Sequence, residues 1–303
     1  MSYITSVSTF SDLLEIFDRC IIWMKRLGLS IPSTRIDKYH KGLRELVEMY
    51  DSGDVRRLDA AQERYLDVLY EVSELIHIYR NFDGSEVEGM LEQLKYVKDG
   101  PETRSGERAA DSSIKARNTA FELLVGATLH RVGFIIDLSN VEDVAANFEN
   151  IHCVVECKRP SSVAKIVHSL NTALSQCKRR IERDAIPIAL GIVSIDFSKV
   201  VNPQDGKLYC DSPDEIDRDL GFFIDHYSNE YISRSKLRFN KRCLGVLARV
   251  STIAISRSTS TPYYAQQWRF IINSDVSEKH RAASNMVVSA MQNVLPSTNY
   301  ARR

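Results

Sequence analysis

The sequence predicts a mixed α/β fold, in which a helical N-terminal region precedes a central sheet flanked by helices. Through residues 1–97, apolar residues recur at spacings of three and four, which is typical of amphipathic helices. After Gly133 the pattern changes to short apolar runs separated by turn residues, which is typical of strands. An apolar fraction of 44% and a charged fraction of 26% in 303 residues exclude a mostly disordered chain, a collagen-like repeat and a disulfide mini-protein.

Residues 1–98 are predicted to form an acidic helical bundle. Its four helices are expected at about residues 11–27, 39–50, 58–79 and 85–97. Ser11 or Asp12 can cap the first helix, and Gly28 with Pro32 ends it. Residues 1–100 contain 13 basic and 18 acidic side chains, a net of −5, and no catalytic pattern. The bundle is therefore expected to mediate oligomerisation or to bind a protein partner.

A linker and an α/β region follow the bundle. Residues 99–113 are rich in Gly, Pro, Ser and charge, and are predicted to be the linker. The expected elements after it are a helix at 113–132, strands at 134–138, 142–148 and 151–157, a helix at 162–184 and a strand at 188–195. The last strand is apolar almost throughout, as expected when both faces are covered. Beyond it we expect helices at 214–233 and 276–294, strands at 244–255 and 268–272, and a frayed tail at 296–303.

Glu156 and Lys158, near the end of the third predicted strand, are the expected centre of a catalytic or metal-binding site. Because side chains alternate along a strand, these two share one face and Cys157 points to the other. An exposed Glu/Lys pair is the alternative interpretation. Asp143 precedes Glu156 by thirteen residues on the predicted hairpin partner, so pairing about the turn at residues 149–150 brings it to the same end. Two carboxylates there would form a hard oxygen site suited to Mg²⁺ or Mn²⁺.

Two further polar residues lie on the neighbouring predicted helices. Glu122 stands among apolar residues on the helix at 113–132, and Gln176 lies on the helix after the strand. In this order, Glu122, Asp143, Glu156-Cys157-Lys158 and Gln176 resemble the PD-(D/E)XK nuclease superfamily, which has a restriction-endonuclease-like fold. The predicted order of helix, three strands, helix and strand is similar to that superfamily's common core. The resemblance covers about residues 113–196.

The sequence departs from the superfamily pattern at the first acid. The Pro-Asp pair of the name is missing, because Val141-Glu142-Asp143 stands there. Glu142 and Asp137 are therefore rivals of Asp143. Asp143 is preferred because Asp-Val entering a strand resembles the superfamily's usual pattern.

The resemblance implies a restriction-endonuclease-like sheet within residues 114–275, followed by a C-terminal helix and tail at 276–303. It also implies an Mg²⁺-dependent (or Mn²⁺-dependent) deoxyribonuclease in restriction or anti-phage defence, with endonuclease and exonuclease action both open. The metal ligands would be Asp143, Glu156, the Cys157 carbonyl and Glu122. Lys158 would hold or deprotonate the attacking water, and Gln176 would orient Lys158 or that water; a solvated helix residue is the alternative for Gln176. The alternative function is an inactive module of the same fold that binds nucleic acid or a protein.

Lysines and arginines are concentrated in two segments after the third predicted strand, although the chain as a whole has a formal net charge of zero. A DNA backbone is bound by such clusters, with RNA as the alternative partner. The candidate contacts are Arg159, Lys165, Lys178 and Arg179 in the first segment, and Arg234, Lys236, Arg238, Lys241 and Arg242 in the second. A solvated helix face is an equal alternative for residues 178–183.

Six cysteines are scattered without the spacing of a disulfide framework. Cys153 and Cys157 are four apart on a strand with no CxxC partner, so buried thiols are favoured over a zinc site. No apolar run reaches the roughly 18 residues that a membrane span needs, and the first residues lack the basic segment of a signal peptide. A cytoplasmic location without membrane contact is therefore expected.

Overall fold

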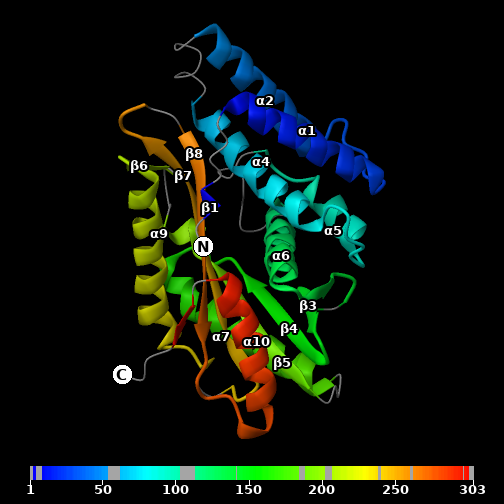
Figure 1. Ribbon diagram of the computed structural model, residues 1–303, viewed down its shortest axis with the longest axis vertical. Helices are drawn as coiled ribbons and strands as arrows, with labels where there is room; N and C mark the ends of the chain where they lie inside the picture. The colour runs from blue at the N-terminus through cyan, green and yellow to red at the C-terminus, as the bar shows by residue number, and fades with distance from the viewer. Residues whose placement is uncertain are drawn as a thin grey trace.

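The computed structural model describes residues 3–4, 9–53, 62–102, 113–140, 142–183, 188–201, 207–237, 240–259, 262–295 and 297–299. Among these residues, nine strands form one sheet with the central order β1-β8-β7-β5-β4-β3-β2, in which β1 is Tyr3–Ile4; β6 pairs with β7 and β9 with β8. Helices cover both faces, and the N-terminal helices gather at one end of the molecule (Figure 1). The predicted mixed α/β class with a helical N-terminal region is confirmed. No described helix is long and apolar enough to cross a membrane.

The N-terminal helices are α1 (Phe10–Arg26), α2 (Arg35–Ser52), α4 (Gln62–Phe82) and α5 (Met90–Val97). The cap of α1 is Thr9, whose Oγ1 accepts a hydrogen bond from Asp12 N at 3.1 Å, so the predicted capping by Ser11 or Asp12 is wrong. Thr34 caps α2 in the same way, and Gly53 ends α2 in the left-handed conformation (φ 67°).

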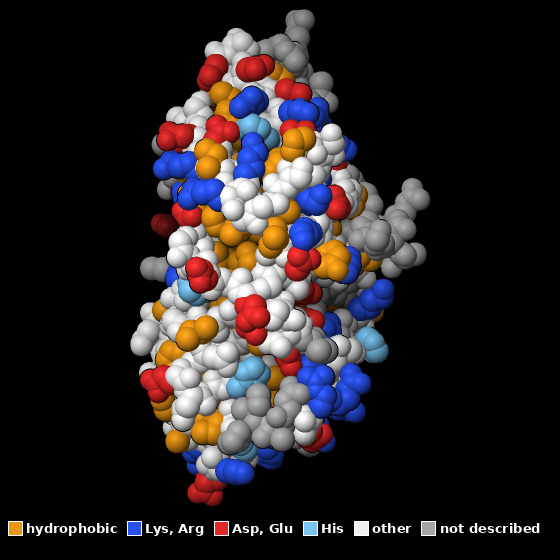
Figure 2. Space-filling model, turned by 90° about the vertical axis from the view of Figure 1, so that its right-hand side faces the viewer, with side chains coloured by type: hydrophobic (Ala, Val, Ile, Leu, Met, Phe, Trp, Pro, Cys, Tyr) orange, Lys and Arg blue, Asp and Glu red, His pale blue; other side chains and the backbone are white. Residues whose placement is uncertain are grey.

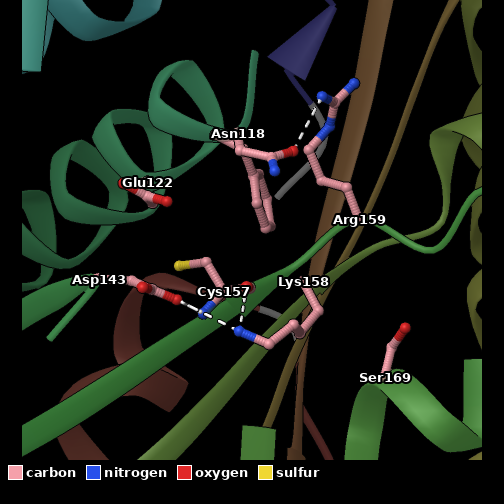
Figure 3. Close-up of a pocket in the computed structure, with 8 residues that line it drawn as sticks. Asn118, Glu122, Asp143, Cys157, Lys158, Arg159 and Ser169 are labelled. Carbon is pink, nitrogen blue, oxygen red and sulfur yellow. Dashed lines mark hydrogen bonds and ion pairs between the residues drawn. The ribbon is translucent and has the colours of Figure 1, made fainter. Parts of the chain in front are cut away.

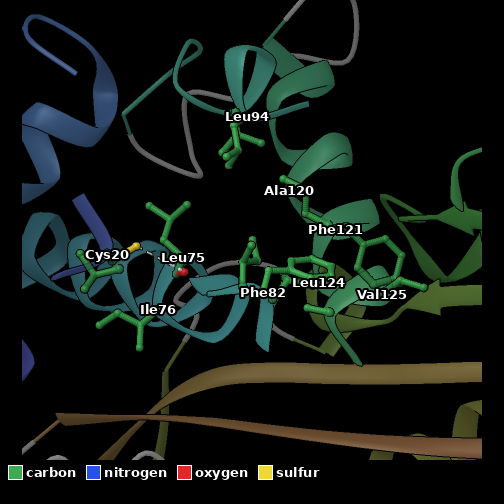
Figure 4. Close-up of a cluster of buried hydrophobic side chains, with 14 of the residues drawn as sticks. Cys20, Leu75, Ile76, Phe82, Leu94, Ala120, Phe121, Leu124 and Val125 are labelled. Atoms are coloured by element: carbon green, nitrogen blue, oxygen red, sulfur yellow. Dashed lines mark hydrogen bonds between the residues drawn. The ribbon is translucent and has the colours of Figure 1, made fainter. Parts of the chain in front are cut away.

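One continuous hydrophobic core joins these helices to the sheet. Helix α6 (Ser113–Val132) lies against both α4 and α5, and Leu124 of α6 belongs to the same buried cluster as Leu75 of α4 and Leu94 of α5 (Figure 4). Val155 of the sheet belongs to that cluster too. Residue 98 therefore does not mark a break in the core. Most of the predicted linker lies outside the described residues.

Buried charges reinforce this junction. Glu71 on α4 accepts a hydrogen bond from Arg117 Nε on α6 at 2.6 Å, and its second oxygen lies 3.8 Å from Arg35 on α2. All three side chains are almost fully buried. The triad thus fixes three helices relative to one another.

The region after α6 follows the predicted order of helix, three strands, helix and strand. Its elements are β2 (Ile135–Asp137), β3 (Val144–Phe148), β4 (Ile151–Lys158), α7 (Ile166–Arg183) and β5 (Ala189–Asp196). β3 and β4 form the predicted antiparallel hairpin, with Glu149 in the turn at φ 53°. β4 and β5 are parallel, and every residue of β5 is buried as predicted. Helix α7 packs on one face of these strands and α6 on the other.

The C-terminal part completes the sheet. Its elements are α8 (Ser198–Val201), β6 (Lys207–Cys210), α9 (Pro213–Tyr227) with a π-helical turn at Ser228–Ile232, β7 (Cys243–Ser256), β8 (Pro262–Ile272), α10 (Arg281–Val294) and β9 (Ser297–Asn299). The predicted tail is wrong for residues 297–299, which pair with β8. Backbone pairing with an existing strand compensates there for the lack of an apolar pattern. All six cysteines are free thiols, as predicted; Cys153 and Cys157 are buried as predicted, and the other four are buried as well.

Candidate active site

The carboxyl end of β4 brings the predicted acids together. Val144 pairs with Val155, so Asp143, which immediately precedes β3, lies beside Glu156. Glu156 points to the α7 side of the sheet, like Val154, whereas Cys157 faces the α6 side. Since helices cover both faces, the Glu156 side chain is fully buried. The alternative of an exposed Glu/Lys pair is therefore wrong.

Three oxygen atoms converge on the ammonium of Lys158. Its Nζ lies 3.5 Å from Asp143 Oδ2 and 3.6 Å from Glu156 Oε2, and donates to the Cys157 carbonyl at 2.9 Å. Figure 3 shows the Asp143 carboxylate directed at the Cys157 backbone and at the Lys158 ammonium. These are three of the oxygens that the resemblance assigns to a metal, and here they surround a single positive charge.

Asp143 is the acid that belongs to this group. Its Oδ2 accepts a hydrogen bond from the Cys157 backbone at 2.7 Å, which fixes it against the end of β4. Asp137 accepts instead from Ser139 N at 2.8 Å, in the loop after β2. Glu142 is buried and lies 3.7 Å from Arg183 on α7. Both rivals are thus held by other partners, whereas Asp143 lies 3.5 Å from Lys158, so the geometry favours Asp143 as preferred from the sequence.

A cavity of about 300 Å³ opens above these residues. Glu122 of α6 lines it with Asp143, and the other lining residues are Asn118, Phe121, Cys157, Lys158, Arg159 and Ser169 (Figure 3). Burial raises the pKa of the Glu122 carboxyl to about 7, and the charge of Asp143 adds to this effect. Burial likewise raises the pKa of Glu156 to about 7, again with a contribution from Asp143. An anionic cluster of this kind gains stability from a cation.

Helix α7 supplies Gln176, which was expected at the site, and Arg180, which was expected only among the surface cations of residues 178–183. Gln176 does not line the cavity, and its Oε1 is buried with no hydrogen-bond partner in the described part of the chain. Arg180, one turn later, forms a short ion pair through Nη1 with Glu156 Oε1. The signal for Arg180 is its spacing of four from Gln176, which places both on one side of the helix.

The donors present suit a divalent cation. Carboxylate and carbonyl oxygens are the ligands that Mg²⁺ and Mn²⁺ prefer. Within the described ranges, no three His, Cys, Asp or Glu side chains are close enough to form a metal site by themselves. The oxygen set at Lys158 combines two carboxylates with a main-chain carbonyl, and an ammonium already stands in for a cation between them. The residues therefore fit a site in which part of the coordination comes from the backbone.

Arg159 is the predicted nucleic-acid contact that borders the cavity. Its Nη1 donates to Asn118 on α6 at 3.5 Å, and its Nε lies 3.6 Å from Asp196 at the end of β5. Asp196 also pairs with the buried Arg249, which in turn contacts Glu74 on α4 at 2.5 Å. These ion pairs form a continuous chain from the N-terminal helices to the cavity, which was not predicted from the sequence. The sequence feature that could have indicated it is Arg249, a single arginine within the otherwise apolar run of β7.

Most of the other lysines and arginines that were predicted to contact nucleic acid are exposed. Those that are exposed are Lys165, Lys178, Arg179, Arg234, Lys236 and Lys241. Arg242 is only partly exposed, and Arg238 lies outside the described residues. Lys236 N donates to Asn171 of α7 at 2.8 Å, so the second cationic segment packs beside α7, which carries part of the first. On the face to the right of Figure 1, acidic and basic side chains are intermixed over the upper, helical half (Figure 2).

Comparison with known proteins finds no matching family model, no similar curated protein and no similar solved structure. The interpretation of the site therefore rests on its own geometry and on the sequence pattern.

Proposed function

We propose that this protein is a metal-dependent nuclease that hydrolyses DNA phosphodiester bonds with Mg²⁺ or Mn²⁺. The observation that carries the proposal is the convergence of Asp143, Glu156 and the Cys157 carbonyl on one cationic position, at the base of a polar cavity. Such a group of oxygens next to a lysine suits hydrolysis of a phosphodiester.

Each residue has a defined task in this proposal. A bound divalent ion lowers the pKa of a water molecule and neutralises charge on the phosphate. Asp143 and Glu156 would hold the ion, with the Cys157 carbonyl and Glu122 as further oxygen donors. Lys158, which would give up its place between the two acids, has a flexible stem suited to holding the attacking water. Arg159, held between Asn118 and Asp196, binds a phosphate at the rim of the cavity.

A cleavage assay tests the proposal. Supercoiled and linear DNA, and a single-stranded RNA, are incubated with the full chain in Mg²⁺, in Mn²⁺ or in EDTA. We expect metal-dependent DNA cleavage by the wild type and a loss of at least about 100-fold in Glu156→Gln. Glu182→Gln, an exposed glutamate on the same helix as Arg180, is the matched control and should cleave normally. Cleavage that survives Glu156→Gln refutes the site.

A second function is favoured by one observation. Asp143 and Glu156 are already paired with Lys158 and Arg180, so the acidic cluster is neutralised without a metal. This arrangement suits an inactive module of the same fold that binds nucleic acid or a protein. DNA retention that weakens with salt, without cleavage in either metal, would favour it. The proposed setting is restriction or anti-phage defence, with the N-terminal helices as the surface for oligomerisation or a protein partner.

A further inference from the structure

Glu156 carries two positive partners, one on each carboxylate oxygen. Arg180 Nη1 pairs with Oε1, and Lys158 Nζ lies 3.6 Å from Oε2. The Glu156 side chain is fully buried, so neither oxygen is compensated by bulk water.

The two partners differ in what they can do when a divalent ion arrives. Lys158 lines the cavity, contacts Asp143 as well, and stands where the three oxygens converge. A metal ion bound by these oxygens must displace it. Arg180 reaches Glu156 from α7, does not line the cavity, and contacts the oxygen that faces away from Lys158. It can remain in place while Oε2 changes partner.

We propose that Arg180 is the positioning residue of the metal site: by holding Oε1 of Glu156, it turns Oε2 toward Asp143 and stays bound when the ion replaces Lys158. This inference rests on the proposed function, because it concerns the same site. Lys158 is then the exchangeable partner of Glu156 and Arg180 the permanent one. A guanidinium suits the permanent role, since it is always charged and its planar geometry orients a carboxylate.

The alternative is the opposite role for Arg180. If Arg180 competed with the ion for Glu156, removing it would free the carboxylate and tighten metal binding. The two arrangements predict changes of opposite sign in one measurement. Partners that orient a metal ligand in this way typically change affinity by about 10- to 100-fold when lost.

The experiment measures Mn²⁺ binding to the metal-free full chain at pH 8, by calorimetry and by the electron paramagnetic resonance of free Mn²⁺. We expect one site in the wild type, loss of binding in Glu156→Gln, and at least about tenfold weaker binding in Arg180→Gln. Arg180→Lys keeps the charge, so its affinity for Mn²⁺ should lie between those of the wild type and of Arg180→Gln. Arg218→Gln removes an exposed arginine on α9 and should bind Mn²⁺ like the wild type.

The outcomes separate this inference from the proposed function. Wild-type affinity, or tighter binding, in Arg180→Gln overturns the role of Arg180 and leaves the metal site intact. Absence of Mn²⁺ binding by the wild type overturns the metal site, and this inference with it. Thermal unfolding in EDTA checks that each variant is folded. If Arg180→Gln does not fold, Arg180→Lys decides: wild-type affinity overturns the inference, and weaker binding with a normal melting temperature supports it.

Discussion

Replacing Glu122 with glutamine should stabilise the metal-free protein, and the gain should grow as the pH rises. Burial raises the pKa of this carboxyl from 4.5 to about 7, with a further contribution from Asp143. Between these two values the unfolded chain releases the proton while the folded protein retains it. The free energy of unfolding of the wild type therefore falls as the pH rises through this window. Glutamine cannot ionise, so the variant avoids that loss.

The magnitude follows from the two pKa values. Each tenfold change in proton affinity is worth about 1.4 kcal/mol, so a pKa of about 7 against 4.5 corresponds to at most about 3.5 kcal/mol above pH 7. Glu122 borders an open cavity, and water there screens part of the effect. We expect Glu122→Gln to gain about 1–3 kcal/mol at pH 8 and little at pH 5.

Urea unfolding in EDTA at pH 5 and pH 8, followed by the fluorescence of the buried Trp23 and Trp268, measures this gain. Glu48→Gln, at an exposed position on α2, is the control and should differ little from the wild type at either pH. If Glu122→Gln changed the free energy of unfolding equally at both pH values, or lowered it more at pH 8 than at pH 5, the ionised form of this carboxyl would not be destabilised by its surroundings.

Four further predictions concern two glycines that lie close to neighbouring backbone, the buried triad around Glu71, and the proposed metal site. Gly245→Ala should cost about 3 kcal/mol in urea unfolding, because a Cβ there would lie 2.1 Å from the Ile271 carbonyl of β8. Gly89→Ala should cost about 2–3 kcal/mol and lower hydrogen-exchange protection in α5, because φ is +78° and backbone atoms of the loop after β2 lie 2.5 Å away. Glu71→Ala should cost about 3–5 kcal/mol, because it leaves Arg117 buried without its closest carboxylate. Mn²⁺ should raise the melting temperature at pH 8 and much less at pH 5.5, where the site carboxyls hold protons.

Three of these expectations have a specific outcome that would contradict them. Gly53→Ala is the control for Gly89→Ala: Gly53 also has a positive φ but has open space around it, so its substitution should cost only about 1–2 kcal/mol. If Gly89→Ala costs no more than this control, the close docking of α5 against the loop after β2 is wrong. A small effect of Glu71→Ala would mean that the triad does not hold the helices together. Equal stabilisation by Mn²⁺ at both pH values would argue against binding through these carboxyls.

Local patterns were sufficient for most elements. The spacing of apolar residues identified the N-terminal helices and α6, and the apolar run of β5 correctly indicated burial on both faces. The hairpin was predictable because a two-residue turn at residues 149–150 joins its strands and fixes their register, which placed Asp143 beside Glu156. Short elements such as α8, β6 and β9 were not predicted, because their few residues carry no period and they depend on pairing or packing with distant parts of the chain.

The sequence by itself therefore determined the order of the elements from α6 to β5 and the proximity of Asp143, Glu156 and Lys158, because alternation along strands and the length of one turn are local properties. The tertiary structure decided three other matters: the complete burial of Glu156, its pairing with Arg180, and the charged chain from Arg159 through Asp196 to the N-terminal helices. Burial and ion pairing depend on which helix covers which face of the sheet. That choice follows from packing the whole apolar surface of the chain, which no short segment encodes.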